Sequence, residues 1–163
     1  MKGLVVFFTR TGKTRKLAEA IASACGGELE ELREVGVNRE GIGGWLRAGR
    51  DGMKQKTVAI EPAIRRPADY DVVFVGSPVW GGNLSPAVRT YLKEAGGGVK
   101  RIAVFCTMDG KDDGGTFASM RSLVPSAKVV GELAVRGQDA RDAEALRARV
   151  TAWIGDVRRA AGA

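Results

Sequence analysis

The chain has no histidine among its 163 residues, and this absence excludes several kinds of catalytic and metal site. Ser-His-Asp and Cys-His catalysis both need an imidazole to move a proton, and many metal sites use it as a ligand. Histidine is also the side chain most often used for proton transfer near neutral pH. We therefore expect the chemistry of this protein to come from a bound cofactor.

The chain has only two cysteines, Cys25 and Cys106, which are far apart in the sequence and form no C-x-x-C motif. Two cysteines are too few for a disulfide framework or a structural zinc site. A tyrosine-phosphatase loop at Cys106 would need an arginine six residues later, where Asp112 stands. We expect both cysteines to be small buried hydrophobic residues.

Long apolar runs are also missing, since none approaches the roughly 20 residues that a membrane-spanning helix needs. The first residues, Met1-Lys2-Gly3 followed at once by an apolar stretch, lack the pattern of a signal-peptide cleavage site. A chain of this length with 44% hydrophobic content suits one domain that buries about two-thirds of its unfolded surface. We therefore expect a single domain over residues 1–163, no membrane association and a cytoplasmic location.

Acidic residues are outnumbered, 19 against 26 lysines and arginines, which gives a net charge of +7 and a pI near 9.8. This balance favours acidic partners. Nucleic-acid binding is not expected, because no helix-turn-helix, RNP or zinc-finger signature accompanies the charge. The C-terminal charges alternate in sign, which is typical of a solvated helix face. One group of cations precedes the first acidic residue, Glu19: Lys2, Arg10, Lys13, Arg15 and Lys16.

The first apolar run, residues 4–8, leads directly into the loop Thr9-Arg10-Thr11-Gly12-Lys13-Thr14. The first turn of a helix leaves four backbone N–H groups unpaired, and the helix dipole adds partial positive charge there. With threonine hydroxyls beside them, such amides are suited to binding phosphate. An alternative is that Thr9 and Thr11 only cap the following helix. The loop is not a P-loop, because Phe7 stands where that motif requires glycine.

Apolar runs alternate with helical periodicity along the chain. Strands are predicted at residues 4–8, 28–34, 72–75, 102–106 and 129–135. Helices are predicted at residues 12–24, from Ser85-Pro86, through Phe117, Met120 and Val124, and from Asp139 onwards. This alternation predicts an α/β fold, with a doubly wound parallel sheet of five strands and helices on both faces. Ligands of such sheets bind beyond the carboxyl ends of the strands.

Three glycine-containing loops follow strands at that edge, at residues 9–14, 76–83 and 107–114. A further segment, residues 41–53, resembles a helix broken by glycines, with Trp45 or Leu46, Gly49 and Met53 on one side. Structural packing is the favoured interpretation of this segment. The alternative is that it borders a bound ring and receives a partner.

In these motifs the chain resembles the flavodoxin family, from Met1 to the last helix. Residues 9–14 are similar to the family's phosphate loop, S/T-x-T-G-x-T, and residues 70–83 are similar to its third strand and first flavin-ring loop. The uninterrupted strand at 129–135 is similar to the short-chain type. The resemblance implies the strand order 2-1-3-4-5, of which flavodoxin is a known example, and noncovalently bound FMN between strands one and three.

The resemblance also implies a role for each matching residue. The FMN phosphate would be bound by Thr9, Arg10, Thr11, Gly12, Lys13 and Thr14. The isoalloxazine ring would lie along Ser77, Pro78, Val79, Trp80, Gly81 and Asn83, and its pyrimidine edge would approach Thr107, Met108, Asp109 and Gly110. Trp80 is expected to stack on the ring. The alternative is that Trp80 covers the helix that starts at Ser85.

The chain departs from flavodoxins that shuttle electrons, which are usually acidic and carry an aromatic residue in the third loop. Here the chain is basic and has Met108 and Asp109 in that loop, so a redox protein partner is expected to be acidic. Arg10 and Lys13 predict an FMN affinity that falls with salt. Carboxylates close to the flavin N1 disfavour its anionic reduced form, so three acidic residues predict a lowered reduction potential. They are Asp109, Asp112 and Asp113.

Two main functional hypotheses follow from the resemblance. In the first, the protein is an FMN electron carrier that passes electrons between redox proteins and needs no catalytic side chain. In the second, it is an enzyme that takes hydride from NAD(P)H and reduces a quinone or another small acceptor, with Arg or Lys residues holding phosphate groups. A basic nucleic-acid binder on this scaffold is a third hypothesis, which would show salt-dependent DNA affinity and no flavin spectrum. The oligomeric state is left open.

Overall fold

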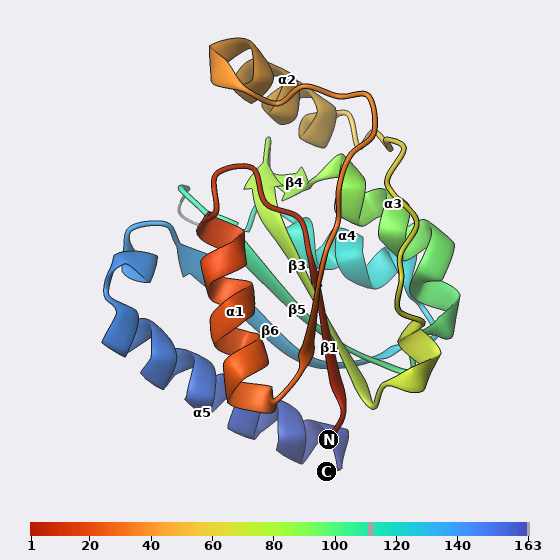
Figure 1. Cartoon of the computed structure of the whole chain (residues 1–163), viewed down its shortest axis with the longest axis vertical. Coiled ribbons are helices and arrows are strands. Elements are labelled where there is room, and N and C mark those ends of the chain that lie inside the picture. Colours follow the sequence, from red (N-terminus) through yellow and green to blue (C-terminus); the bar gives the residue numbers. More distant parts are fainter. Residues whose placement is uncertain (111–112, 163) are drawn as a thin grey trace.

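The computed structural model describes residues 1–110 and 113–162, which form a twisted sheet with helices on both faces (Figure 1). Five strands are parallel: β1 (Gly3–Phe7), β2 (Glu28–Glu31), β3 (Val72–Trp80), β5 (Arg101–Met108) and β6 (Lys128–Arg136). They lie in the order β2-β1-β3-β5-β6. A sixth strand, β4 (Asn83–Leu84), pairs antiparallel with the end of β3. The predicted fold class is confirmed, and the predicted strand order differs by this added strand.

The helices cover the two faces of the sheet in pairs (Figure 1). Helices α1 (Lys13–Cys25) and α5 (Ala143–Ala161) lie on one face, and α3 (Pro86–Ala95) and α4 (Thr116–Leu123) lie on the other. Alternate residues of β1 enter the two cores, since Val5 and Phe7 face α1 and α5 while Leu4 and Val6 face α3 and α4. This double burial explains why β1 is apolar throughout.

The remaining helix, α2 (Gly41–Met53), lies beyond the carboxyl ends of the strands rather than against a sheet face (Figure 1). It is a continuous helix, although five glycines occur within its bounds. Its Gly52 packs directly on β3, because a Cβ at this position would be 2.1 Å from the carbonyl oxygen of Trp80. This close contact fixes α2 above the end of β3.

Several predicted boundaries are wrong. Residues 76–80 continue β3 rather than forming a loop, and Gly81-Gly82 then turns the chain into β4. Both glycines have positive φ, 56° and 74°, which is the backbone of a type I′ hairpin turn. The last helix begins at Ala143 rather than at Asp139, which lies in a short 3₁₀ turn, η3 (Asp139–Arg141). The Asp142 carboxylate caps this helix by accepting hydrogen bonds from two amides.

Two further 3₁₀ turns lie in connections: η1 (Pro67–Asp69) precedes β3, and η2 (Gly96–Gly98) lies between α3 and β5. Strand β2 ends at Glu31, three residues before its predicted end. Both cysteines are buried and free, as predicted. Within residues 1–110 and 113–162, no helix is both long enough and apolar enough to cross a membrane.

Candidate functional site

The three loops predicted from the sequence converge on one narrow cleft of about 120 Å³ at the carboxyl edge of the sheet. Residues of the first loop (Thr9, Arg10, Thr11, Lys13 and Thr14), the second (Pro78, Val79 and Trp80) and the third (Thr107, Met108 and Asp109) line it together with Trp45. They meet there because β1, β3 and β5 are adjacent parallel strands that end at the same edge.

The first loop presents backbone amides at the start of α1. Gly12 is the N-cap residue in a left-handed conformation, with φ of 84°, and its own N–H donates to Thr9 Oγ1 at 3.0 Å. No side chain among the described residues caps the first turn of α1. The interpretation of Thr9 and Thr11 as helix caps is therefore wrong, and the first-turn amides are left for another acceptor.

A buried pair of hydroxyls connects the first loop to the third. Thr14 Oγ1 lies 2.8 Å from Thr107 Oγ1, and both residues are almost fully enclosed. One hydroxyl donates to the other within this pair, so one hydroxyl hydrogen remains to donate elsewhere. Because both threonines line the cleft, that hydrogen is available to an anion bound there.

An ion pair crosses the cleft from the first loop to the third. Lys13 Nζ lies 2.8 Å from Asp109 Oδ1 and 3.1 Å from Oδ2, and both side chains are exposed to solvent. The pair is therefore screened and contributes little to stability. Its position shows that the charge of Asp109 is partly balanced by Lys13.

The three predicted carboxylates do not act as one group. Asp113 accepts a hydrogen bond at 2.9 Å from the Phe117 N–H in the first turn of α4, and Asp112 lies outside the described residues. Asp109 is the member that lines both the cleft and the larger cavity described below.

Trp80 contributes to the cleft, but its ring is packed on more than one side. The Phe8 ring meets it edge to face with centroids 5.5 Å apart, and the Arg39 guanidinium lies 5.3 Å from its centroid. Only 9% of the residue is exposed. The Arg39 guanidinium lies over one face of the ring, so a ligand could stack on that face only if Arg39 moved.

Arg39 is the centre of a buried ion triad. Its guanidinium donates to both Glu34 oxygens, at 2.7 and 3.1 Å, and to Asp51 Oδ2 at 2.7 Å. The side chains are 8% (Arg39), 3% (Glu34) and 10% (Asp51) exposed. Burial alone would raise the pKa of Asp51, but hydrogen bonds from Arg39 and Lys56 bring it below its ordinary value. The triad connects the segment after β2 to α2 and to Trp80.

Ser77 and Asn83 line neither cavity, so the ring contact predicted for them is not supported by their positions. The Ser77 hydroxyl is buried, where it accepts from the Ser85 N–H at 2.8 Å and donates to the Pro78 carbonyl at 2.9 Å. Asn83 Oδ1 accepts from Arg89 and from the Leu84 amide. Both residues shape the hairpin that presents Val79 and Trp80.

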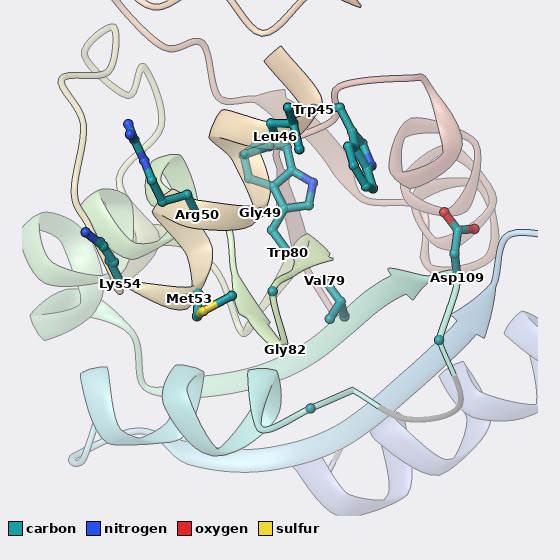
Figure 2. Close-up of a pocket in the computed structure, with 14 residues that line it drawn as sticks. Trp45, Leu46, Gly49, Arg50, Met53, Lys54, Val79, Trp80, Gly82 and Asp109 are labelled. Atoms are coloured by element: carbon teal, nitrogen blue, oxygen red, sulfur yellow. The ribbon is translucent and has the colours of Figure 1, made fainter. Parts of the chain in front are cut away.

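A larger cavity of about 710 Å³ adjoins the cleft and shares Trp45, Val79, Trp80 and Asp109 with it. The second loop adds Gly81 and Gly82 to its lining, and the third adds Gly110 and Gly114. Figure 2 shows the remaining wall, which comes from α2.

The α2 wall contains residues for which the sequence interpretation favoured structural packing and gave bordering a bound ring as the alternative. Trp45, Leu46 and Met53 are 61%, 60% and 69% exposed, so structural packing is the wrong interpretation for them. The helix packs instead through its small residues, including Ala48 and Gly52. The signal in the sequence was the spacing of Trp45, Gly49 and Met53, which places them on one face of a helix.

The two cavities together fit a phosphate ester of a flat aromatic ring. Amides and hydroxyls at the start of α1 form a donor set for a dianion. Two glycines of the larger cavity bring backbone rather than side chains together, since a Cβ on Gly114 would come 2.5 Å from the Gly82 Cα. These glycines line the same cavity as Trp45, the aromatic residue of α2.

A sequence profile of the flavodoxin family matches residues 2–154, and the chain belongs to this family. Solved structures agree in fold. A candidate flavoprotein from Bacteroides uniformis has 21% identity and a TM-score of 0.76, with 94% of this chain and 97% of that chain covered. A flavoprotein from Lactobacillus acidophilus, solved in complex with FMN, has 21% identity and a TM-score of 0.68, covering 87% and 97%. A Fusobacterium nucleatum flavodoxin bound to FMN has 11% identity and a TM-score of 0.63, covering 97% of each chain.

Proposed function

We propose that this flavodoxin-family protein binds FMN noncovalently and carries electrons between redox partners. The observation that carries the proposal is that a donor-rich helix terminus and a cavity with aromatic walls adjoin each other at one edge of the sheet. Family membership and the FMN complexes of the two relatives named above support the same cofactor here. When bound, FMN supplies the redox chemistry, because its ring accepts and releases electrons.

The first loop would hold the phosphate. The amides at the start of α1 and the Thr11 hydroxyl donate hydrogen bonds, and Arg10 and Lys13 add positive charge. Arg10 is held in place by donating to the Arg39 carbonyl at 3.3 Å. Because the two cations are solvent-accessible, their contribution should weaken as salt is added.

The walls of the larger cavity would hold the ring and exclude water from part of it. Val79 and Trp80 come from the second loop, Asp109 comes from the third, and Trp45 comes from α2. An electron carrier needs no proton-donating side chain, which agrees with a chain that lacks histidine. The net charge of +7 supports an acidic redox partner.

Titration of FMN and riboflavin into the apo-protein tests the proposal through the quenching of flavin fluorescence. FMN should bind more tightly than riboflavin, and the difference should shrink at high salt and in Lys13→Ala. The matched control Lys93→Ala removes an exposed lysine on the outer surface of α3 and should leave both affinities unchanged. FMN binding that is absent, or no tighter than riboflavin binding, would refute the phosphate site.

A second candidate function is reduction of a small acceptor at the expense of NAD(P)H. This candidate is supported by the part of the larger cavity, about 710 Å³ in all, that extends along α2 beyond the residues shared with the cleft and that could hold a small acceptor beside the ring. Stopped-flow mixing of the FMN-loaded protein with NADPH and NADH distinguishes the two functions. Direct flavin reduction within seconds would support the reductase, and no reduction would support the carrier.

A further inference from the structure

The larger cavity extends well beyond the part that it shares with the cleft. It is about six times the volume of the cleft, and it continues along α2 from Trp45 to Lys54. We call the part lined by Leu46, Gly49, Arg50, Met53 and Lys54 the outer cavity. None of these residues lines the cleft that contains the phosphate loop.

The walls of the outer cavity suit a flat apolar body. Leu46 and Met53 leave most of their side chains in solvent, which is unfavourable unless a ligand covers them. Gly49 stands one turn before Met53, and the hairpin residue Gly81 packs so closely on it that a Cβ on Gly81 would lie 2.5 Å from the Gly49 carbonyl oxygen. Backbone therefore forms one wall, and long apolar side chains form the others.

The two ends of the larger cavity carry side chains of opposite charge. Arg50 lies in the last turn of α2 and Lys54 is its C-cap residue, and Figure 2 shows both at the end of the cavity away from Asp109. The Arg50 Nε lies 3.7 Å from Asp51 Oδ1 but the side chain remains largely exposed, and Lys54 forms no ion pair with any described residue. Two cations beside an apolar wall complement an anion attached to an apolar ring.

We propose that the outer cavity binds a flat aromatic acid, with its ring against Leu46 and Met53 and its carboxylate or sulfonate at Arg50 and Lys54. Acidic quinones belong to this class. This inference rests on the proposed function because the outer cavity adjoins the expected position of the flavin ring. It names the class of small acceptor that the second candidate function would reduce.

Calorimetric titration of the FMN-loaded protein with 1,4-naphthoquinone-2-sulfonate, and with uncharged 1,4-naphthoquinone, tests the proposal without measuring activity. The sulfonate should bind about fivefold or more tightly than the uncharged ring, since two partly exposed cations each contribute several tenths of a kcal/mol. The double variant Arg50→Ala/Lys54→Ala should abolish this preference. The control Lys93→Ala/Arg147→Ala removes the same charge from exposed positions outside the cavity and should preserve it.

The apolar part of the site is tested by Leu46→Ala and Met53→Ala, which should weaken both ligands several-fold. Ile64→Ala removes an even more exposed apolar side chain outside the cavity and should weaken neither. Equal affinity for the two naphthoquinones, or a charge preference that survives Arg50→Ala/Lys54→Ala, would overturn the proposal. Displacement of the sulfonate by FMN would also overturn it, because the two ligands would then share one site.

The two proposals can fail separately. FMN that loads normally while the sulfonate does not bind would overturn the outer cavity and leave the cofactor site intact. FMN that does not load would overturn the proposed function, and the titration repeated on the apo-protein would then decide the outer cavity by itself.

Discussion

Replacing Arg39 by alanine should destabilise this protein more than removal of any exposed arginine. The substitution leaves the carboxylates of Glu34 and Asp51, which are 3% and 10% exposed, without their main partner. Breaking a buried ion pair by removing one partner costs about 3–5 kcal/mol. Lys56 stays 3.3 Å from Asp51 and keeps part of that charge balanced, so the lower end of the range is expected.

Urea denaturation of the apo-protein, followed by tryptophan fluorescence, measures this loss. With a slope of about 2 kcal/mol per M, a loss of about 3 kcal/mol lowers the midpoint by roughly 1.5 M. Arg66→Ala is the matched control, because Arg66 also pairs with a carboxylate, Asp69 at 3.1 Å, but on the surface. An exposed pair of this kind contributes less than about 1 kcal/mol.

A second comparison separates the unpaired charges from the lost packing. Adding Glu34→Gln and Asp51→Asn to Arg39→Ala removes the buried charges and should recover part of the stability. The Arg39 guanidinium also lies over Trp80, so Arg39→Ala should weaken FMN binding as the cavity wall loosens. An Arg39→Ala protein as stable as Arg66→Ala, or one that is destabilised further by the two neutral replacements, would refute the reasoning.

Four further predictions concern pH, potential, thiol reactivity and packing. The pKa of Asp51 is held below its ordinary value, so its ionised form contributes stability above about pH 4 that is lost as the pH falls further. Asp51→Asn should therefore be less stable at pH 6 and lose less stability between pH 6 and pH 3; parallel stability curves would contradict this. Asp109→Asn removes a negative charge from the cavity wall and should raise the potential of bound FMN by about 20 mV in a redox titration, whereas the surface change Asp156→Asn should not. Burial raises the pKa of Cys106 to about 12 and also raises that of Cys25, so neither thiol should react rapidly with a disulfide reagent at pH 8 until the protein unfolds. Gly76→Ala would place a Cβ 2.1 Å from the Phe105 ring and should lower the melting temperature by several degrees, whereas Gly155→Ala, in an uncrowded position of α5, should not lower it.

Local patterns in the sequence predicted the parallel sheet and the loop, residues 9–14, that borders the cleft. Residues 4–8 are apolar throughout because β1 is buried on both faces, and this composition is visible without a structure. The Ser85-Pro86 start of α3 was equally predictable, because proline at the first helical position depends on backbone geometry alone. The three predicted loops meet at the carboxyl edge of the sheet because β1, β3 and β5 are adjacent parallel strands, and residues of all three loops line the cleft.

Contacts between residues distant in the sequence were decided by the tertiary structure alone. Ser77 belongs to a motif that predicted contact with the flavin ring, but its hydroxyl is buried and accepts a hydrogen bond from the Ser85 N–H. The local sequence around Glu34, Arg39 and Asp51 does not indicate that they are buried. Their burial is tolerated because Arg39 forms ion pairs with both carboxylates in the folded chain. The exposed face of α2 could not be identified from periodicity, since a helical apolar stripe indicates which residues share a face but not whether anything covers that face. Composition and periodicity were enough to predict the fold and the edge of the sheet where the candidate site lies, because both depend on local patterns. Which side chains line that site depends on contacts that form only in the folded chain.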